Sequence, residues 1–303
     1  MRWVLAGASG FLGKALHAEL GRLGHDVVRL VRRPPESPHE SAWNPVRGEV
    51  DPGVLGEADV VVNLAGANIG RVPWTASYRH TIRASRVTTT RTLARALADL
   101  ENPPTFIAQS AIRYYGVGRG DELLTEDSGP GEGFLASVVQ EWEAATEPAE
   151  RAGVRVVRLR TGVVLDSSGG AFPLLVLPFR FGLGGQLGSG RQYMGMISLV
   201  DWLAAVRFVA EREDCRGPYN LTLPEPPTNA EFTKALGAAL HRPTVARVPA
   251  FVLRTLLGGF SAELLDSVRI VPRRLLDAGF RFTAPDVESL VATALRQPSD
   301  RPT

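Results

Sequence analysis

Three glycines at intervals of three residues, Gly7, Gly10 and Gly13, stand near the start of the chain. An apolar run at 3–6 precedes them, and a helix-like stretch at 14–20 follows them. Between a strand and a helix, glycines allow a tight turn, let the backbone approach phosphate groups, and let the helix pack closely on the strand. The spacing therefore predicts a pyrophosphate site for a dinucleotide cofactor at the helix N-terminus, and the alternative is a structural turn without a ligand. The residues of this predicted site are Gly7, Ala8, Ser9, Gly10, Phe11, Leu12 and Gly13.

Two arginines end the second apolar run, 27–31, about 20 residues beyond the glycines. In NAD-binding folds an acidic side chain at this point binds the ribose hydroxyls, whereas this chain has Arg32 and Arg33 there. A guanidinium can hold a 2′-phosphate through two hydrogen bonds. We therefore expect both arginines to bind the cofactor, and the cofactor to be NADP(H) rather than NAD(H). The alternative is that they are solvated side chains at a strand end.

A third candidate for cofactor binding is the run Asn63, Leu64, Ala65 and Gly66, which closes an apolar stretch that begins at Asp59. Small residues at the end of a strand let the backbone come close to a bound ribose. We expect these four residues to contact the cofactor. The alternative is a simple turn at the end of the strand.

Short apolar runs alternate with helix-like stretches through the first two thirds of the chain. This alternation is typical of right-handed βαβ units, and it predicts an α/β fold with a Rossmann doubly wound parallel sheet. In such a sheet, ligands bind at the carboxyl ends of the strands. We expect strands at 3–6, 27–31, 59–66, 105–110, 154–159 and 219–222, and helices at 75–99, 134–152 and 200–211.

The pattern changes at residue 166, where a glycine-rich stretch begins. We expect residues 1–165 to form the dinucleotide-binding domain, to which residues 197–225 return. Residues 166–196, expected to be rich in loops, and 226–303 then form a smaller mixed and helix-rich region that covers the substrate. The last six residues, 298–303, are expected to fray.

Composition narrows the function classes. The 303 residues are 44% hydrophobic, which suffices for a packed core, and they carry a formal net charge of +2, which lends no support to nucleic-acid binding. The single cysteine, Cys215, permits neither an intrachain disulfide nor a cysteine metal site, and the five histidines lack metal-ligand spacing. We expect a soluble cytoplasmic protein with a small-molecule substrate, no metal, no nucleic-acid partner and no membrane segment.

Tyr114, Tyr115 and Gly116 complete a set of motifs that resembles the extended or atypical short-chain dehydrogenases/reductases. More narrowly, the chain resembles the bacterial epimerase-family proteins that carry a C-terminal DUF1731 region. The resemblance covers nearly the whole chain, and it implies a nicotinamide cofactor, a small or sugar-nucleotide-like substrate, and a homodimer paired through helices near 75–99 and 134–152. Further segments that carry it are Trp74-Thr75, Ser85-Arg86, 110–116, 124–126, 142–145, 160–165, 169–170, 178–180, 182–185, 188–190, 220–221, 228–229, 242–243, Pro272 and 279–280.

The usual catalytic pair of this superfamily is missing. In typical members a tyrosine exchanges a proton with the substrate, and a lysine four residues later lowers the pKa of that tyrosine. The resemblance places this pair at Phe134 and Val138, which carry neither a hydroxyl nor an amine. The only lysines are Lys14 and Lys234, and neither lies near this position in the sequence.

Tyr115, Tyr114 and Ser110 remain as candidates for acid–base chemistry, because they follow a predicted strand and so lie beside the expected nicotinamide. Either tyrosine can carry a proton if its pKa falls from about 10. Ser110 can orient the substrate, unless Ala111 holds that position. The alternative is that one tyrosine packs and the other shapes the pocket. Glu126 is a further candidate proton carrier, although a surface-loop or helix-capping role is favoured.

Two later features concern the substrate side. The backbone amides of 182–192, with Arg180 and Arg191 beside them, can bind an anionic substrate or form a mobile lid. Asp201 is expected to be a helix N-cap or to hold the lid. Ser198 stands where the family pattern has a histidine, so no role of that histidine is carried over to this chain.

Two function classes remain open. The first is an NADP(H)-dependent oxidoreductase or epimerase that acts on an unknown small or sugar-nucleotide-like substrate. The second is a non-catalytic NADP(H)-binding sensor whose occupancy alters an interaction with a partner. The missing tyrosine–lysine pair favours the sensor, whereas the retained pocket segments favour the enzyme, which is our expectation.

Overall fold

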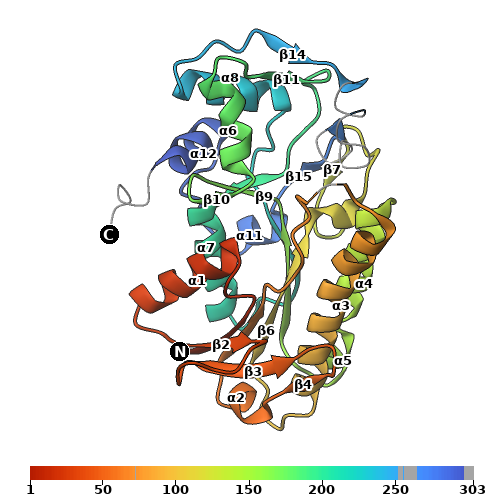
Figure 1. Cartoon of the computed structure of the whole chain (residues 1–303), viewed down its shortest axis with the longest axis vertical. Helices are drawn as coiled ribbons and strands as arrows, with labels where there is room; N and C mark the ends of the chain where they lie inside the picture. The colour runs from red at the N-terminus through yellow and green to blue at the C-terminus, as the bar shows by residue number, and fades with distance from the viewer. Residues whose placement is uncertain (72, 252–254, 256–264, 297–303) are drawn as a thin grey trace.

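Eight strands form the main sheet of the structure, a computed structural model that describes residues 1–71, 73–251, 255 and 265–296 (Figure 1). The strand order is β13-β8-β6-β5-β1-β2-β3-β4. Neighbouring strands pair in parallel except for β4, which is antiparallel to β3. The predicted Rossmann sheet is confirmed. Its strands are β1 (Arg2–Ala6), β2 (Asp26–Val31), β3 (Glu40–Asn44), β4 (Glu49–Val50), β5 (Val60–Asn63), β6 (Thr105–Ala111), β8 (Val156–Thr161) and β13 (Gly217–Leu221).

The chain reverses the direction in which it adds strands between β1 and β5. From β1 it continues to β2 and β3 on one side, and it then crosses to β5, β6, β8 and β13 on the other side. At such a switch point the loops that follow the two central strands diverge and leave a crevice at the carboxyl ends. The glycine turn follows β1 and the run from Leu64 to Gly66 follows β5, so two of the predicted cofactor segments meet at this crevice.

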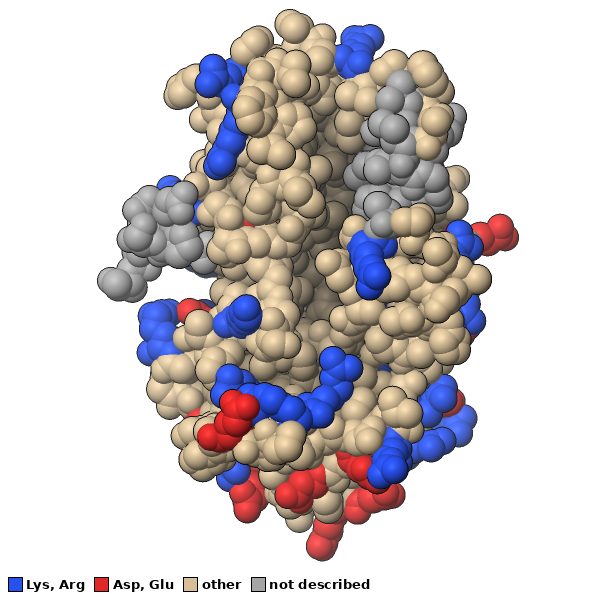
Figure 2. All heavy atoms as spheres, viewed as in Figure 1, with Lys and Arg blue, Asp and Glu red and all other residues tan. Residues whose placement is uncertain are grey.

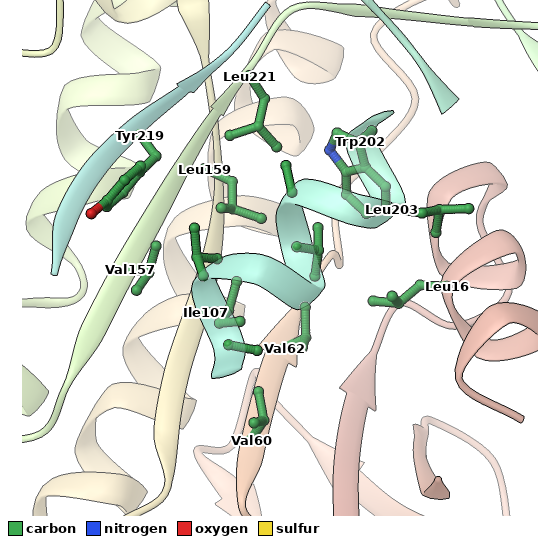
Figure 3. Close-up of a cluster of buried hydrophobic side chains, with 14 of the residues drawn as sticks. Leu16, Val60, Val62, Ile107, Val157, Leu159, Trp202, Leu203, Tyr219 and Leu221 are labelled. Atoms are coloured by element: carbon green, nitrogen blue, oxygen red, sulfur yellow. The ribbon is translucent and has the colours of Figure 1, made fainter. Parts of the chain in front are cut away.

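Helices cover both faces of the sheet, because successive side chains of a strand point to opposite faces. On one face Leu16 of α1 and Trp202 of α7 pack with Val62 and Leu159, and Figure 3 shows α7 lying across these strands. On the other face α2, α3 and α5 pack on the sheet, with Leu93 of α3 in the cluster. The helices are α1 (Phe11–Arg22), α2 (Pro52–Gly56), α3 (Ala76–Ala98), α4 (Phe134–Ala144), α5 (Glu147–Arg151) and α7 (Leu199–Glu211), and a 3-10 turn, η1, spans Ile112–Tyr115.

A smaller region lies beyond the carboxyl ends of the strands, in the upper half of Figure 1. Its three-stranded sheet, in the order β10-β9-β12, packs with α6, α8 and α12 around a cluster that includes Phe172, Phe232 and Leu290. None of the described helices has the length and apolarity needed to cross a membrane. The end predicted to fray, 298–303, lies outside the described residues. The elements are β7 (Leu123–Leu124), β9 (Val163–Asp166), β10 (Gly169–Gly170), α6 (Phe172–Arg180), β11 (Gly185–Leu187), β12 (Met196–Ser198), α8 (Asn229–Ala239), β14 (Ala246–Val248), β15 (Arg269–Ile270), α11 (Arg273–Asp277) and α12 (Val287–Leu295).

Asp201 fastens the C-terminal segment to this framework. Its buried carboxylate accepts hydrogen bonds from the N–H groups of Thr283 at 2.6 Å and Ala284 at 3.0 Å. The residue that caps α7 is Ser198, whose hydroxyl accepts the N–H of Asp201 at 3.0 Å. The expectation that Asp201 itself caps the helix is wrong, because Asp201 lies inside the first turn of α7 and its carboxylate binds a segment far along the chain.

Two stretches differ from the expected elements. The helix expected at 134–152 is two helices, α4 and α5, and Pro148 stands at the start of the second, where its ring is compatible with a helix. The stretch expected to be loops contains α6, because Phe172, Val176 and Phe179 fall on one helical face and are buried there. The short strands β3 and β4 at one end of the sheet were not expected, since they have few apolar residues.

Candidate functional site

Close backbone contacts leave no room for a side chain at Gly7 and Gly13. Gly7 has a φ of +82°, and a Cβ on it would lie 2.6 Å from the carbonyl carbon of Leu64. A Cβ on Gly13 would lie 2.2 Å from the carbonyl oxygen of Gly7. Glycine is therefore required at Gly7 for the approach of β1 to the turn after β5, and at Gly13 for the packing of α1 on the turn.

Gly10 differs from the other two glycines, because a Cβ there would lie 3.5 Å from the oxygen of Gly7, an ordinary contact. Gly10 is the N-cap of α1, no side chain caps this helix, and its first turn has no acidic residue. The first N–H groups of a helix have no partner within the helix, and together they favour an anion. The open space at Gly10 and the uncapped helix end fit a pyrophosphate that approaches the backbone here.

Phe11 connects the turn to the smaller region. A Cβ on Gly169 would lie 2.8 Å from Cδ2 of Phe11, and one on Gly170 would lie 3.0 Å from its Cε1. The two glycines of β10 therefore let the β9–β10 hairpin rest on the Phe11 ring. This contact brings the glycine-rich stretch after residue 166 directly to the N-terminus of α1.

Asn63 shapes the turn after β5 from inside the protein. Its buried amide donates to the hydroxyl of Thr90 at 2.9 Å, and its Oδ1 accepts the N–H of Ala65 at 3.1 Å. The Trp142 indole donates to the same Thr90 hydroxyl at 2.8 Å, which ties α3 to α4. The Asn63 side chain thus points away from the crevice, and the backbone of Ala65 and Gly66 is what this run offers to a ligand.

The two arginines after β2 are not equivalent. Arg33 makes two hydrogen bonds of 2.9 Å to the carboxylate of Glu40, and this pairing lowers the pKa of Glu40. Arg29 also contacts Glu40, at 2.8 Å. Arg32 is exposed and makes no hydrogen bond or ion pair within the described part of the chain. Of the predicted pair, Arg32 is the guanidinium that is free to bind a phosphate.

A deep cleft runs down the face of the molecule shown in Figure 2. Basic side chains gather at its lower end, over the part of the molecule where α1 and β2 lie in Figure 1. The segment 182–192, expected to bind an anion or to form a lid, contains β11, which pairs with β14. Arg180 and Arg191, which flank this segment, are both exposed.

The hydroxyl of Tyr115 is buried, and it both donates and accepts a hydrogen bond within the protein. Tyr115 has no exposed surface, its hydroxyl donates to Oδ1 of Asn220 at 2.7 Å, and it accepts a hydrogen bond from Arg160 at 3.0 Å. Burial raises its pKa to about 12. Ser110 is equally buried and donates to the carboxylate of Glu143 at 2.6 Å. These contacts are a physical reason against the proton-transfer role expected of Tyr115 and the orienting role expected of Ser110.

Arg160 and Glu143 are site residues that the sequence reasoning did not single out. Arg160 makes two hydrogen bonds to Glu143, at 2.8 and 2.9 Å, and both residues are buried. The sequence did hold a sign of this pair. Arg160 directly follows the predicted apolar strand 154–159, and Glu143 follows Trp142 in a largely apolar helix; a charge in such a position is unexpected unless it is paired. Asn220, which binds Tyr115, lies 105 residues away in the chain, so spacing alone does not connect the two.

Tyr114 has a different environment from its neighbour. Its ring packs edge-on against Tyr115, with centroids 5.5 Å apart, and it lies 3.5 Å from the guanidinium carbon of Arg160. The residue is partly exposed, and within the described chain its hydroxyl makes no hydrogen bond. A cation beside the face of a phenol ring interacts favourably with it. Tyr114 is the one expected catalytic residue whose hydroxyl is left free by the described protein.

The two positions at which the resemblance places the tyrosine and the lysine lie in apolar packing. Val138 is buried and packs with Ile82 and Leu135 between α3 and α4, and Phe134 rests against this cluster. Neither of these side chains can transfer a proton.

Of the two structural roles expected of Glu126, the surface-loop acid is wrong, whereas the helix-capping acid fits its contact with the first turn of α11. It is only 5% exposed, and its carboxylate accepts the N–H of Asn220 at 2.9 Å and that of Arg274 at 3.4 Å. Burial raises its pKa. Glu126 joins β13 to the start of α11, and so it links the main sheet to the C-terminal part of the chain.

Comparisons with known proteins agree with this architecture. A model of the NAD dependent epimerase/dehydratase family matches residues 3–167, and one of a domain of unknown function, DUF1731, matches 248–294. An epimerase family protein of Mycobacterium leprae is 43% identical over 97% of this chain and 96% of its own length. The mouse epimerase family protein SDR39U1 is 36% identical over 95% of this chain and 98% of its own length.

Solved structures show the same fold. Human epimerase family protein SDR39U1, crystallised with NADPH, superposes with a TM-score of 0.88 at 32% identity and covers 97% of this chain and 99% of its own. A nucleoside-diphosphate sugar epimerase from Corynebacterium glutamicum gives a TM-score of 0.81 at 34% identity and covers 97% of this chain, which spans 58% of that longer one. The protein therefore belongs to the NAD-dependent epimerase/dehydratase family, among the epimerase family proteins that carry a C-terminal DUF1731 domain.

Proposed function

We propose that this protein binds NADP(H) across the cleft and transfers hydride to or from a small-molecule substrate, as an oxidoreductase or an epimerase. The observation that carries the proposal is that the exposed Arg32 follows β2 while the uncapped, glycine-lined start of α1 follows the neighbouring strand β1, so both stand at the carboxyl ends of adjacent parallel strands. The human relative solved with NADPH supports the same cofactor. We propose further that residues 1–165 with 197–225 hold the cofactor, and that 166–196 and 226–303 cover the substrate.

Each half of the cofactor has a proposed set of contacts. The backbone of Gly7 to Gly13 holds the pyrophosphate, and Arg32 holds the 2′-phosphate of the adenosine. The backbone of Ala65 and Gly66 lies against the ribose of the nicotinamide half. Arg33 supports Arg32 indirectly, because its bond to Glu40 orders the chain after β2. The bound nicotinamide supplies the hydride, and the protein supplies position and a proton.

We propose Tyr114 as the residue that moves the proton. Its hydroxyl is free in the described protein, and the charge of Arg160 stands 3.5 Å from the centre of its ring. Tyr115 would have to leave two hydrogen bonds before it could reach a substrate, so we assign it, with Ser110, to the support of the site wall.

Cofactor affinity tests the binding part of this proposal. In calorimetric titrations, Arg32→Ala should weaken NADPH about tenfold to a hundredfold, since a hydrogen bond to a charged group is lost, and should leave NADH nearly unchanged. Arg33→Ala is the matched control, because its side chain is already paired, and it should weaken NADPH much less. Tighter binding of NADH than NADPH by the unmodified protein would overturn the assignment of NADP(H).

Turnover tests the chemical part. The absorbance of NADPH is followed with a panel of aldehydes and ketones. Sugar nucleotides are incubated with the protein and NADP⁺ and analysed for the epimeric product, because epimerisation returns the hydride and leaves no net change in NADPH. With any substrate that reacts, Tyr114→Phe should lower kcat at least about tenfold, as expected for the loss of a proton carrier. Tyr115→Phe should lower the free energy of unfolding, because two buried hydrogen bonds are lost, and should leave kcat nearly unchanged. An unchanged kcat in Tyr114→Phe would remove that residue from the mechanism.

A non-catalytic NADP(H) sensor is the second candidate. It is favoured by one observation, that Val138 and its apolar neighbours fill the position of the superfamily lysine. Tight binding of NADPH without turnover on any member of the panel, together with a partner protein that is retained only when NADPH is present, would support the sensor. Turnover that depends on Tyr114 would exclude it.

A further inference from the structure

Arg86 is a partly buried cation that has no carboxylate partner within the described chain. It lies on α3, its guanidinium donates to the carbonyl oxygens of Ile82 at 3.0 Å and Ala67 at 3.1 Å, and it stands 5.2 Å from the centre of the Trp142 ring. Within the described chain it makes no ion pair. Burial lowers its pKa to about 10. A largely buried charge without a counter-charge destabilises a fold, so its presence calls for a compensating role.

A structural role explains a second arginine, Arg155, but not Arg86. Arg155 also makes no ion pair within the described residues, and it donates to the carbonyl oxygens of Val209, Ala210 and Arg212. These oxygens end α7, where the helix dipole supplies negative charge. The carbonyl of Ile82, by contrast, lies within α3, one turn before Arg86, and the helix continues to Ala98.

The position of Arg86 relates it to the cleft. The guanidinium carbon would lie 3.4 Å from a Cβ on Gly66, so it rests directly on the turn after β5. The hydroxyl of Ser85 accepts the N–H of Ala67 at 2.9 Å, and this bond already holds the same turn to α3. Arg86 remains partly exposed, so it can present donors to a ligand that lies on this turn.

The strand order assigns Arg86 to one half of a dinucleotide. The pyrophosphate turn follows β1, Arg32 follows β2 on one side, and the turn with Gly66 follows β5 on the opposite side. A dinucleotide that lies across the switch point places its two nucleosides on the two sides. If Arg32 holds the adenosine 2′-phosphate, the turn against Arg86 faces the nicotinamide half.

The same part of the site lacks the charge that the superfamily lysine supplies. Val138 is buried against Ile82, the residue whose carbonyl binds Arg86. Trp142, which faces the Arg86 guanidinium, lies one helical turn after Val138 on α4. The Arg86 guanidinium, on α3, therefore lies near Val138 on α4, the position at which the resemblance places the lysine.

We propose that Arg86 binds the oxygen atoms of the nicotinamide ribose-phosphate and so takes the place of the missing lysine as the cation of that half of the site. This inference rests on the proposed binding of NADP(H). A guanidinium has five donors, and the two bonds to carbonyl oxygens leave others for the ligand. Because the charge is already held by α3, cofactor binding does not require Arg86 to be ordered first.

The test compares NADPH with 2′,5′-ADP, which lacks the nicotinamide half, by calorimetry. Arg86→Met should weaken NADPH about tenfold to a hundredfold and should leave 2′,5′-ADP unchanged. Arg86→Lys, which retains the charge without the planar fork, should lose less affinity for NADPH than Arg86→Met. Arg83→Met is the matched control on the same helix, since Arg83 is paired with Glu141 on α4, and it should change neither affinity.

Each result has a distinct meaning. Equal losses of NADPH and 2′,5′-ADP would show that Arg86 only supports the turn that meets Gly7, and would overturn the inference. So would an unchanged NADPH affinity in Arg86→Met. If Arg86→Met does not fold, the ratio of the two affinities in Arg86→Lys decides in the same way. If the unmodified protein binds NADPH and Arg86→Met binds it equally well, the inference fails alone, whereas failure of the unmodified protein to bind NADPH overturns the proposed function as well.

Discussion

Replacing Gly13 by alanine should loosen the fold, whereas replacing Gly10 by alanine should leave the fold intact and weaken cofactor binding. A Cβ on Gly13 would meet the carbonyl oxygen of Gly7 at 2.2 Å, and one on Gly10 would meet the same atom at 3.5 Å. The two glycines stand three residues apart in one turn, so the pair separates packing within the protein from contact with the ligand.

The expected magnitudes follow from these distances. At Gly13 the backbone must move by roughly 1 Å, and overpacking of this kind costs about 1–3 kcal/mol, against a gain in helix propensity of up to about 1 kcal/mol. At Gly10, an N-cap in extended conformation, alanine should cost only about 0.5 kcal/mol. A methyl group on Gly10 keeps the pyrophosphate away from the backbone N–H groups, and the loss should be about tenfold to a hundredfold in affinity.

The assay combines urea unfolding with calorimetric titration of NADPH. Gly21→Ala is the matched control on the same helix, since no atom lies within 4 Å of its Cβ position, and it should gain up to about 1 kcal/mol of stability with unchanged affinity. Unchanged NADPH affinity in a folded Gly10→Ala variant would refute the reasoning, because the pyrophosphate would then lie elsewhere. A Gly13→Ala variant that gains stability as Gly21→Ala does would refute the packing argument.

Three further predictions follow from buried polar groups. The pKa of Glu126 is raised in the folded state, so the folded protein binds the proton more tightly than the unfolded chain does. The free energy of unfolding, measured in urea relative to Glu126→Gln, should therefore fall as the pH rises above the ordinary pKa near 4.5. No relative change over the pH series would contradict the burial of this carboxyl. Asp201→Ala leaves the N–H groups of Thr283 and Ala284 without their acceptor, so it should cost about 2–4 kcal/mol in urea unfolding, and a cost below about 0.5 kcal/mol would contradict the link it makes. In an alkaline titration followed by tyrosinate absorbance, Tyr115→Phe should remove the signal of one tyrosine that ionises only near pH 12. If the signal removed is that of a tyrosine ionising near pH 10, Tyr115 is not buried.

The parallel sheet could be predicted because each of its central strands is a short, continuous apolar run. The helix α6 could not, because Pro173, Pro178 and the glycines after it are typical of loops, and its helical period shows only in Phe172, Val176 and Phe179 once a surface exists for them to cover. Tertiary packing here overrides local signals. The strands β3 and β4 were missed because they are short and carry few apolar residues.

The cofactor segments could be predicted because they are backbone turns formed by residues that are close together in the sequence. The glycine spacing that such a turn requires is visible in the sequence itself. The acid–base residues could not be placed in the same way. Whether Tyr115 is free depends on Asn220 and Arg160, which come from strands that are distant in the chain. Spacing also did not separate Arg32 from Arg33, because the partner of Arg33 is supplied by the start of β3.

The most direct test of the account is the crystal structure of this protein with NADP⁺. We expect the pyrophosphate at the backbone of Gly10, the 2′-phosphate within hydrogen-bond distance of Arg32, and the nicotinamide half against the turn after β5. A cofactor whose pyrophosphate does not contact the start of α1, or whose 2′-phosphate is bound without Arg32, would contradict it.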